Sequence, residues 1–186
     1  MKFEIREYRD EDCEAICQLN SQQLGYDFPI EETRRKLTQL RKSGRNKILV
    51  AEADGTVAGY IHACDYDVIY APHMKNIMGI AVSEKFQRRG IGRALLEGIE
   101  KWAEETGACG IRLVSGAART GAHAFYRSCG YHGEKQQINF KKLFFWLPLQ
   151  TLEKTEVCED TGIRRLSSGC FSFKRRIRRN PSINQI

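Results

Sequence analysis

The N-terminal part of the chain changes from strand-like to helix-like spacing of its apolar positions. Residues 3–6 alternate apolar and polar side chains, which is typical of an edge strand. Residues 13–24 then repeat apolar positions at helical spacing, and Asp10 stands where we expect the residue that caps this helix. Residues 29–44 predict a second helix, which begins near a proline and ends at a glycine.

The next segment predicts antiparallel strands joined by a tight turn. Residues 48–52 and 57–61 are mostly apolar and flank the dipeptide Asp54-Gly55. Because Asp-Gly favours the positive φ angles of a two-residue hairpin loop, we expect these two strands to pair. Residues 76–82 predict a further strand, again mostly apolar.

The second half of the chain alternates helices with short strands. An apolar stripe with helical period follows Gly90 and ends at Gly107. A strand, a short helix and a last strand are then predicted at residues 111–114, 122–129 and 138–140. This order of elements predicts an α/β (α+β) fold, with a mixed, mostly antiparallel central sheet and helices on both faces.

Length and composition fit one domain with a hydrophobic core. The chain has 186 residues, of which 41% are hydrophobic and 28% are charged. No apolar run approaches the roughly 20 residues that span a bilayer, and the charged start does not resemble a signal peptide. We therefore expect a cytoplasmic protein with no membrane partner. The seven cysteines are scattered, so we expect neither a disulfide framework nor a metal site.

Positive charge is concentrated toward the end of the sequence. Of the net charge of +7, residues 144–186 contribute +4, since they hold 8 Lys and Arg against 4 Asp and Glu. We place a boundary near Leu143, between a domain at 3–143 and a basic extension at 144–186. We expect this extension either to be disordered or to dock on another surface. It lacks a regular aromatic pattern, so nucleic acid is not the expected partner.

The segment with the clearest chemical content is residues 82–94, where a strand ends and a helix begins. Gly90 and Gly92 lie at the first turn of that helix, although glycine costs up to about 1 kcal/mol relative to alanine in a helix. Without side chains there, an anion can approach the free backbone N–H groups of the helix start. The spacing equally fits a solvated, glycine-rich helix start. Three arginines add positive charge: Arg88, Arg89 and Arg93.

Two motifs carry a resemblance to a known family. Gln87-Arg88-Arg89-Gly90-Ile91-Gly92 resembles the [QR]-x-x-G-x-[GA] signature of the GNAT superfamily of acetyl-CoA-dependent N-acetyltransferases, which follows that family's fourth strand. Residues 115–131 resemble its later motif, A-x-x-[FL]-Y-x-x-x-G-[FY]. The resemblance covers residues 3–143, and it implies the GNAT fold with acetyl-CoA as a co-substrate.

The resemblance also implies which residues bind the cofactor. In the family, the loop and helix start hold the pyrophosphate of coenzyme A, and the backbone of the fourth strand pairs with its pantetheine arm. Arg119 stands where many members have an asparagine that contacts the cofactor; it either reaches a phosphate or serves as a cap or ion-pair partner. The expected cofactor-binding residues are Ile80, Ala81, Val82, Gln87, Arg88, Arg89, Gly90, Ile91, Gly92, Arg93 and Arg119.

The catalytic assignment follows from the same resemblance. It implies that the Tyr126 hydroxyl protonates the leaving thiolate as a general acid, whereas read alone Tyr126 is a packed aromatic residue. The base is left unassigned. We expect residues 65–73 to form a loop on the acceptor side, whose Asp65, Asp67 and His73 are candidates for accepting the amine proton; Glu84 is a weaker candidate.

The sequence therefore predicts an enzyme that transfers acetyl from acetyl-CoA to a primary amine of a small molecule, by direct attack in a ternary complex. Residues 122–131 resemble the variant of the later motif found in members that act on small amines. Three alternatives stay open: a protein N-terminal or lysine acetyltransferase, a non-catalytic acyl-CoA sensor, and a nucleic-acid-binding protein that uses the basic extension. A homodimer is compatible with the sequence.

Overall fold

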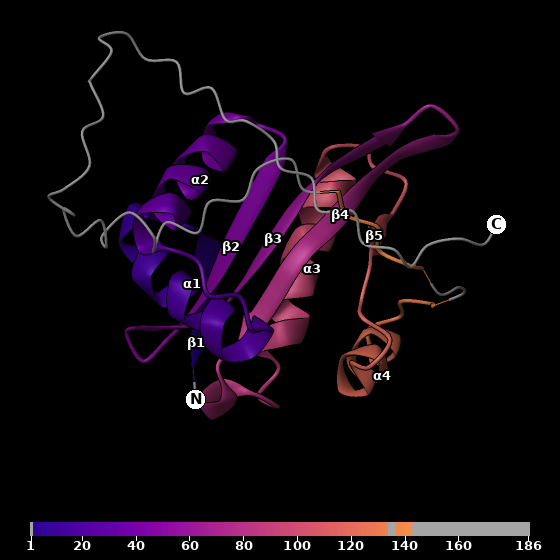
Figure 1. Ribbon diagram of the computed structural model, residues 1–186. Coiled ribbons are helices and arrows are strands. Elements are labelled where there is room, and N and C mark those ends of the chain that lie inside the picture. The colour runs from indigo at the N-terminus through magenta and orange to yellow at the C-terminus, as the bar shows by residue number, and fades with distance from the viewer. Residues whose placement is uncertain (1, 134–136, 143–186) are drawn as a thin grey trace, which may run out of the picture. The chain divides into compact units, whose positions relative to one another are not determined.

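A five-stranded sheet carries the fold of the first of two units, residues 1–137 and 138–186 (Figure 1). The computed structural model describes residues 2–133 and 137–142. Strands β1 to β4 pair as antiparallel neighbours in chain order, and β5 joins β4 in parallel. The strands are β1 (Phe3–Glu7), β2 (Asn46–Ala53), β3 (Thr56–Val68), β4 (Ala71–Val82) and β5 (Ile111–Leu113).

Helices cover both faces of this sheet, as the order of elements predicts. The first two pack over one face, around Ile16, Leu37 and Val50, and the third packs over the other. The helices are α1 (Cys13–Leu19), α2 (Ile30–Lys42), α3 (Ile91–Glu105) and α4 (Thr120–Ser128). Three short helical segments connect them: η1 (Asp10–Asp12) and η3 (Glu84–Phe86) are 3-10 turns, and η2 (Asn20–Leu24) is a π-helix that continues α1.

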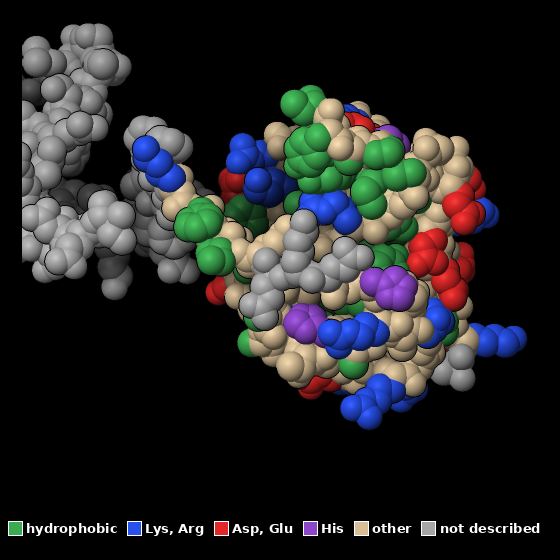
Figure 2. Space-filling view, turned by 90° about the vertical axis from the view of Figure 1, so that its right-hand side faces the viewer, with side chains coloured by type: hydrophobic (Ala, Val, Ile, Leu, Met, Phe, Trp, Pro, Cys, Tyr) green, Lys and Arg blue, Asp and Glu red, His purple; other side chains and the backbone are tan. Residues whose placement is uncertain are grey.

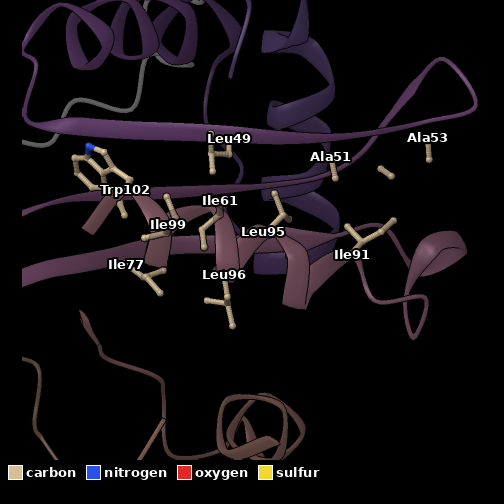
Figure 3. Close-up of a cluster of buried hydrophobic side chains, with 12 residues drawn as sticks. Leu49, Ala51, Ala53, Ile61, Ile77, Ile91, Leu95, Leu96, Ile99 and Trp102 are labelled. Atoms are coloured by element: carbon tan, nitrogen blue, oxygen red, sulfur yellow. The ribbon is translucent and has the colours of Figure 1, made fainter. Parts of the chain in front are cut away.

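The apolar stripe of α3 forms the larger core. Figure 3 shows Ile91, Leu95, Ile99 and Trp102 of this helix among the side chains that project from the sheet. Leu95 and Ile99 are completely buried. The apolar stripe has helical period, and every second side chain of the facing strands points toward it. The same residues therefore favour the helix and bury its apolar face against the sheet.

Two details of the predicted elements are wrong. Asp10 does not cap the first helix: it lies 3.5 Å from Arg41, and the buried Asp12 instead accepts the Arg9 backbone N–H at 2.7 Å. Asp12 also forms an ion pair with Arg6. The carboxylate held at this helix start is therefore that of Asp12, whereas the sequence predicted Asp10. The last strand predicted at 138–140 is absent, since residues 137–142 are described and are not in a strand.

The predicted strand failed because alternating apolar residues do not by themselves supply a pairing edge. Ile138 and Phe140 are the apolar members of that pattern, and they are 80% and 87% exposed. The expectations for the basic extension at 144–186 fall outside the described residues. The boundary near Leu143 stays a prediction.

The parallel pair of β4 and β5 is short, and it opens into a fork. Lys75, Asn76 and Ile77 pair with the three residues of β5, and β4 then continues to Val82. At the opening, Met78 is an extra residue in the ladder with β3, because the register shifts between His62 and Ala63. Such a β-bulge bends its strand, so it accompanies the separation of β4 from β5.

A buried lysine fixes β4 at the closed end of the fork. Lys75 is 1% exposed, and its Nζ lies 2.7 Å from Asp65 Oδ1 and 3.2 Å from His73 Nε2. The same ammonium sits 4.0 Å from the centre of the Trp102 ring of α3. A charge this deeply buried requires a partner, so Asp65 and Trp102 together fix β4 against both β3 and α3.

We expect Asp65→Ala to destabilise the protein much more than Asp67→Ala. Removing Asp65 leaves the Lys75 charge buried without a carboxylate, which should lower the free energy of unfolding by about 3 kcal/mol. Asp67 lies two residues away and also contacts Arg45 and His73, but it is exposed, so its loss should matter little. Urea unfolding of both variants measures the difference. Equal shifts of the two midpoints would show that Lys75 does not depend on Asp65.

Candidate active site

The open edge of β4 presents backbone groups to any ligand that enters the fork. Ser83 donates its N–H to Ala58 O of β3 at 2.9 Å. Because backbone groups of an antiparallel strand point alternately to its two sides, those of Val82 and Ile80 point away from β3, toward the open edge. The backbone groups of Ala81 point the other way, toward β3. Its side chain is buried under α1 and α2.

The turn between β4 and α3 has an unusual backbone. Arg88 has φ +58° and Gly90 has φ +85°, both in the left-handed region. Turns that contain left-handed residues direct successive N–H groups into an anion-binding concavity. Arg88 is exposed at this turn, as is Arg89.

The start of α3 adds further donors. The first helical hydrogen bond runs from Ala94 N–H to Gly90 O at 3.0 Å, and the N–H groups of the preceding turn have no acceptor within the helix. The first turn carries no acidic side chain, and the buried Ile91 anchors it in the core. This end of α3 therefore combines free donors, the positive end of the helix dipole and the nearby arginines.

Structural roles account for part of the motif. A Cβ added to Gly92 would lie 3.1 Å from the ring of Phe125 in α4, so this glycine permits helix packing as well as any approach of a ligand. Arg93 donates from Nη2 to Ser128 O at 2.8 Å and so caps the end of α4. A bulky residue at Gly92 would displace α4, and it would not test the cradle alone.

Two of the predicted cofactor residues hold the end of η2. Gln87 donates from Nε2 to Val82 O at 3.1 Å and to Gln23 Oε1 at 3.2 Å. Arg119 donates from Nη2 to Leu24 O at 3.3 Å. The loop before α3 and the start of α4 are thus both attached to the π-helix that follows α1. The contact of Arg119 is of the capping kind that the sequence left open.

Tyr126 lies half-buried on α4. Its ring centre is 5.4 Å from that of Phe125 and 6.1 Å from that of Tyr131, and it packs against the α3 core. Burial raises the pKa of Tyr126, while the charge of Arg119 acts in the opposite direction. Tyr131 donates its hydroxyl to Glu100 at 3.0 Å, but the Tyr126 hydroxyl has no hydrogen-bond partner within the described residues.

The loop predicted at residues 65–73 is instead the end of a long hairpin. β3 continues to Val68 and β4 begins at Ala71, because Asp65 and Asp67 alternate with Tyr66 and Val68 and so suit a strand. Three of the four predicted candidates for the base, Asp65, Asp67 and His73, are engaged with one another or with Lys75 and Arg45. His73 Nδ1 lies 2.6 Å from Asp67 Oδ1, and this hydrogen bond lowers the pKa of the Asp67 carboxyl. Glu84 lies exposed at the start of η3.

A polar chain links His62 to the end of α2. His62 Nε2 lies 3.0 Å from Asn46 Oδ1, Asn46 donates from Nδ2 to Ser43 Oγ at 2.6 Å, and Ser43 donates to Leu40 O at 2.9 Å. The Asn46 amide donates to Ser43 from its nitrogen, so the atom that faces His62 is its oxygen, which accepts from His62 Nε2–H. The Nδ1 atom of His62 then keeps its lone pair. Burial lowers the pKa of His62, so the ring is neutral near pH 7.

Sequence reasoning missed Arg112, which lies at the fork. It is the only polar residue of β5, and its guanidinium carbon sits 4.2 Å from the centre of the Tyr66 ring. A charged residue in the middle of an apolar strand was the available signal. The spacing did not show it, because the register of β5 against β4 depends on contacts far apart in the sequence.

Within the described residues, no helix is long and apolar enough to cross a membrane. The same part of the chain brings no three His, Cys, Asp or Glu side chains together in a group that could hold a metal ion.

Comparisons with known proteins agree with this geometry. Over 120 residues the chain is 27% identical to an aminoglycoside N(6')-acetyltransferase type 1 of Stenotrophomonas maltophilia, covering 62% of this chain and 76% of that protein. The solved structure of AAC(6')-Iy with the bisubstrate analogue CoA-S-monomethyl-acetylneamine has a TM-score of 0.69 and 18% identity, and covers 77% of this chain and 99% of that one. A transcriptional regulator from Bacillus halodurans C-125 also has a TM-score of 0.69, at 20% identity, covering 76% and 100%.

The two structures show that the fold is shared. A family model gives the stronger result, because it matches residues 13–131 and so spans both motifs, β4 and the start of α3. The chain belongs to the acetyltransferase (GNAT) family.

Proposed function

We propose that this protein transfers the acetyl group of acetyl-CoA to a primary amine of a small molecule, by direct attack in a ternary complex. The observation that carries the proposal is the open edge of β4, which runs from the bulge at Met78 to the turn before α3. The aminoglycoside acetyltransferase of S. maltophilia is a relative that acts on such an acceptor, as its name states.

The residues present fit coenzyme A. The left-handed turn at Arg88 and Gly90 and the free N–H groups of α3 suit its pyrophosphate, with Arg88 adding charge. Ile80 and Val82 offer edge backbone groups to the amides of its pantetheine arm, although the Val82 carbonyl already accepts from Gln87. Acetyl-CoA supplies the activated acyl group; this chain orients it.

Tyr126 is suited to act as a general acid. Its raised pKa keeps the phenol protonated near neutral pH, so the hydroxyl can donate. It is also free of a partner within the described residues, unlike Tyr131 on the same side of α3. We assign Tyr126 the protonation of the thiolate that leaves when the amine attacks.

The amine must lose a proton before or during attack. Asp65, Asp67 and His73 are engaged in the network around Lys75 and Arg45, so none of them is poised as a free base. The carboxylate-free β4 segment after the bulge offers no base either. We therefore assign this proton to solvent, and expect positioning of the two substrates to supply much of the rate.

Arg88→Gln should weaken coenzyme A binding by about 10-fold, the effect of losing one charge-assisted contact to phosphate. Titration calorimetry with coenzyme A at low and high salt measures it, and the difference from the parent should shrink as salt rises. Arg127→Gln removes an equally exposed arginine from the last turn of α4 and serves as the matched control. Equal affinities of parent and Arg88→Gln would remove this turn from the cofactor site.

Tyr126→Phe should lower turnover by roughly 10- to 1000-fold while leaving coenzyme A affinity nearly unchanged. The loss should be largest at low pH, because a thiol with a pKa near 8.5 leaves increasingly unaided as the pH approaches that value. The pH–rate profile with a saturating amine tests this. Tyr131→Phe is the control, since it removes a hydroxyl that is already bonded to Glu100.

If the profiles of Tyr126→Phe and the parent coincide at equal rates, Tyr126 has no part in proton transfer. A uniform loss at every pH would point to displaced substrate instead, so the coenzyme A affinity of the variant has to be measured alongside.

A further inference from the structure

One face of the fork carries an arginine that the mechanism does not use. Cys64 of β3 pairs with Asn76 of β4, and Asn76 pairs with Arg112 of β5, so the three side chains project to one face of the sheet. Tyr60 precedes Cys64 by four residues, an even number, and is buried beneath α1 and α2. Arg112 therefore lies on the face that these helices cover.

The helices do not bury this part of the face. Cys64, Tyr66, Asn76 and Arg112 are all half-buried, and none belongs to the cluster under α1 and α2. Met78, at the opening of the fork, is 60% exposed. The strand rises about 3.4 Å per residue, so Arg112 lies opposite a point about 7 Å along β4 from the bulge.

Arg112 is held in place but is not neutralised. Its guanidinium carbon lies 4.2 Å from the Tyr66 ring centre, so the side chain reaches across β4 onto β3. No carboxylate within the described residues forms an ion pair with it. A guanidinium stacked on a ring keeps the N–H donors along its edge available, and their planar arrangement matches two oxygens of a carboxylate or a phosphate.

The distribution of charge around the fork also favours an anionic ligand at Arg112. Asp65 and Asp67 lie on the opposite face with Lys75, and η2 contains no charged residue. Asp27, in the connection from η2 to α2, is exposed. Seen from the side of β5 and α4, Asp and Glu side chains stand mostly at the margins, while Lys, Arg, His and hydrophobic side chains occupy the centre (Figure 2).

We propose that the acceptor amine carries an anionic group, a carboxylate or a phosphate, that Arg112 binds beside the fork, and that polycationic amines are poor acceptors. This inference rests on the proposed function and specifies its substrate class. A polycation would meet at the fork an arginine that pairs with no carboxylate of the described residues, whereas an anion on the amine would complete the ion pair that Arg112 lacks there.

Pairs of acceptors that differ only by the anion test this. Glucosamine 6-phosphate against glucosamine reports on phosphate, tyrosine against tyramine reports on carboxylate, and neamine is the polycation. We expect kcat/KM for the member of at least one pair that carries the anionic group to exceed that of its partner without the group, and of neamine, by about 10-fold or more. The pair that responds tells which anion is bound.

Variants at Arg112 assign the effect to this residue. Arg112→Gln should lower kcat/KM for the preferred acceptor with an anionic group by about 10- to 100-fold, and leave kcat/KM for its partner without that group within about 3-fold of the parent value. Arg112→Lys keeps the charge but loses the planar guanidinium, so its kcat/KM for the same acceptor should lie between those of the parent and Arg112→Gln. Arg41→Gln, an exposed arginine of α2, is the control. Thermal unfolding confirms that each variant is folded.

The outcomes separate this inference from the proposed function. Calorimetric binding of each acceptor pair in the presence of coenzyme A shows the anion preference without turnover. Preferred binding of the anionic member with no acetylation of any amine would refute the transferase and retain the anion site. Higher kcat/KM for neamine or for the partners without the anionic group, or an equal loss for both members of a pair in Arg112→Gln, would overturn the anion site and retain the transferase.

Discussion

The three-residue parallel pairing of β4 with β5 is the constraint on which the rest of the site depends. If the pairing continued to Val82, the edge groups of Ile80 and Val82 would be used up in the sheet, and the turn before α3 would face a closed edge. Because it stops at Ile77, hydrogen-bonding groups that a sheet normally satisfies are left for another molecule. The bulge at Met78 makes the stop abrupt.

The buried network at Lys75 fixes β4, one of the two strands of the fork, against the rest of the fold. Asp65, Lys75 and Trp102 join β3, β4 and α3, so movement of β4 away from β3 or α3 would expose or unpair a charge. The backbone ladder at Lys75, Asn76 and Ile77 joins this fixed segment of β4 to β5. The ion pair and its aromatic neighbour thus hold the strand whose second half forms the open edge.

Periodicity and turn chemistry predicted most of the fold. Asp54 and Gly55 both adopt positive φ, as their hairpin requires, and the stripe of α3 forms the core as its spacing predicts. Both signals are local. The error at residues 65–73 has two parts: the alternation of Asp65 and Asp67 with Tyr66 and Val68 is a strand pattern that could be read from the sequence, whereas the pairing of these carboxylates with Lys75 and Arg45 could not.

The same limit applies to the site. The motif located the turn before α3, but it did not show that Gly92 also admits Phe125 or that Arg93 caps α4. Arg112 was missed because what distinguishes it within the described residues is the lack of a carboxylate partner, rather than any sequence pattern that it completes. A missing ion-pair partner can be recognised only when the neighbours of a residue in three dimensions are known.

The left-handed conformation of Arg88 has an evolutionary consequence. An L-residue with a side chain pays about 1 kcal/mol or more for this backbone geometry, and glycine would relax it. A chain selected for stability alone would therefore drift toward glycine at this position. Conformational ease and positive charge therefore compete at a single residue. A search for thermostable variants would tend to find substitutions here, and each would remove the charge that we propose for coenzyme A binding.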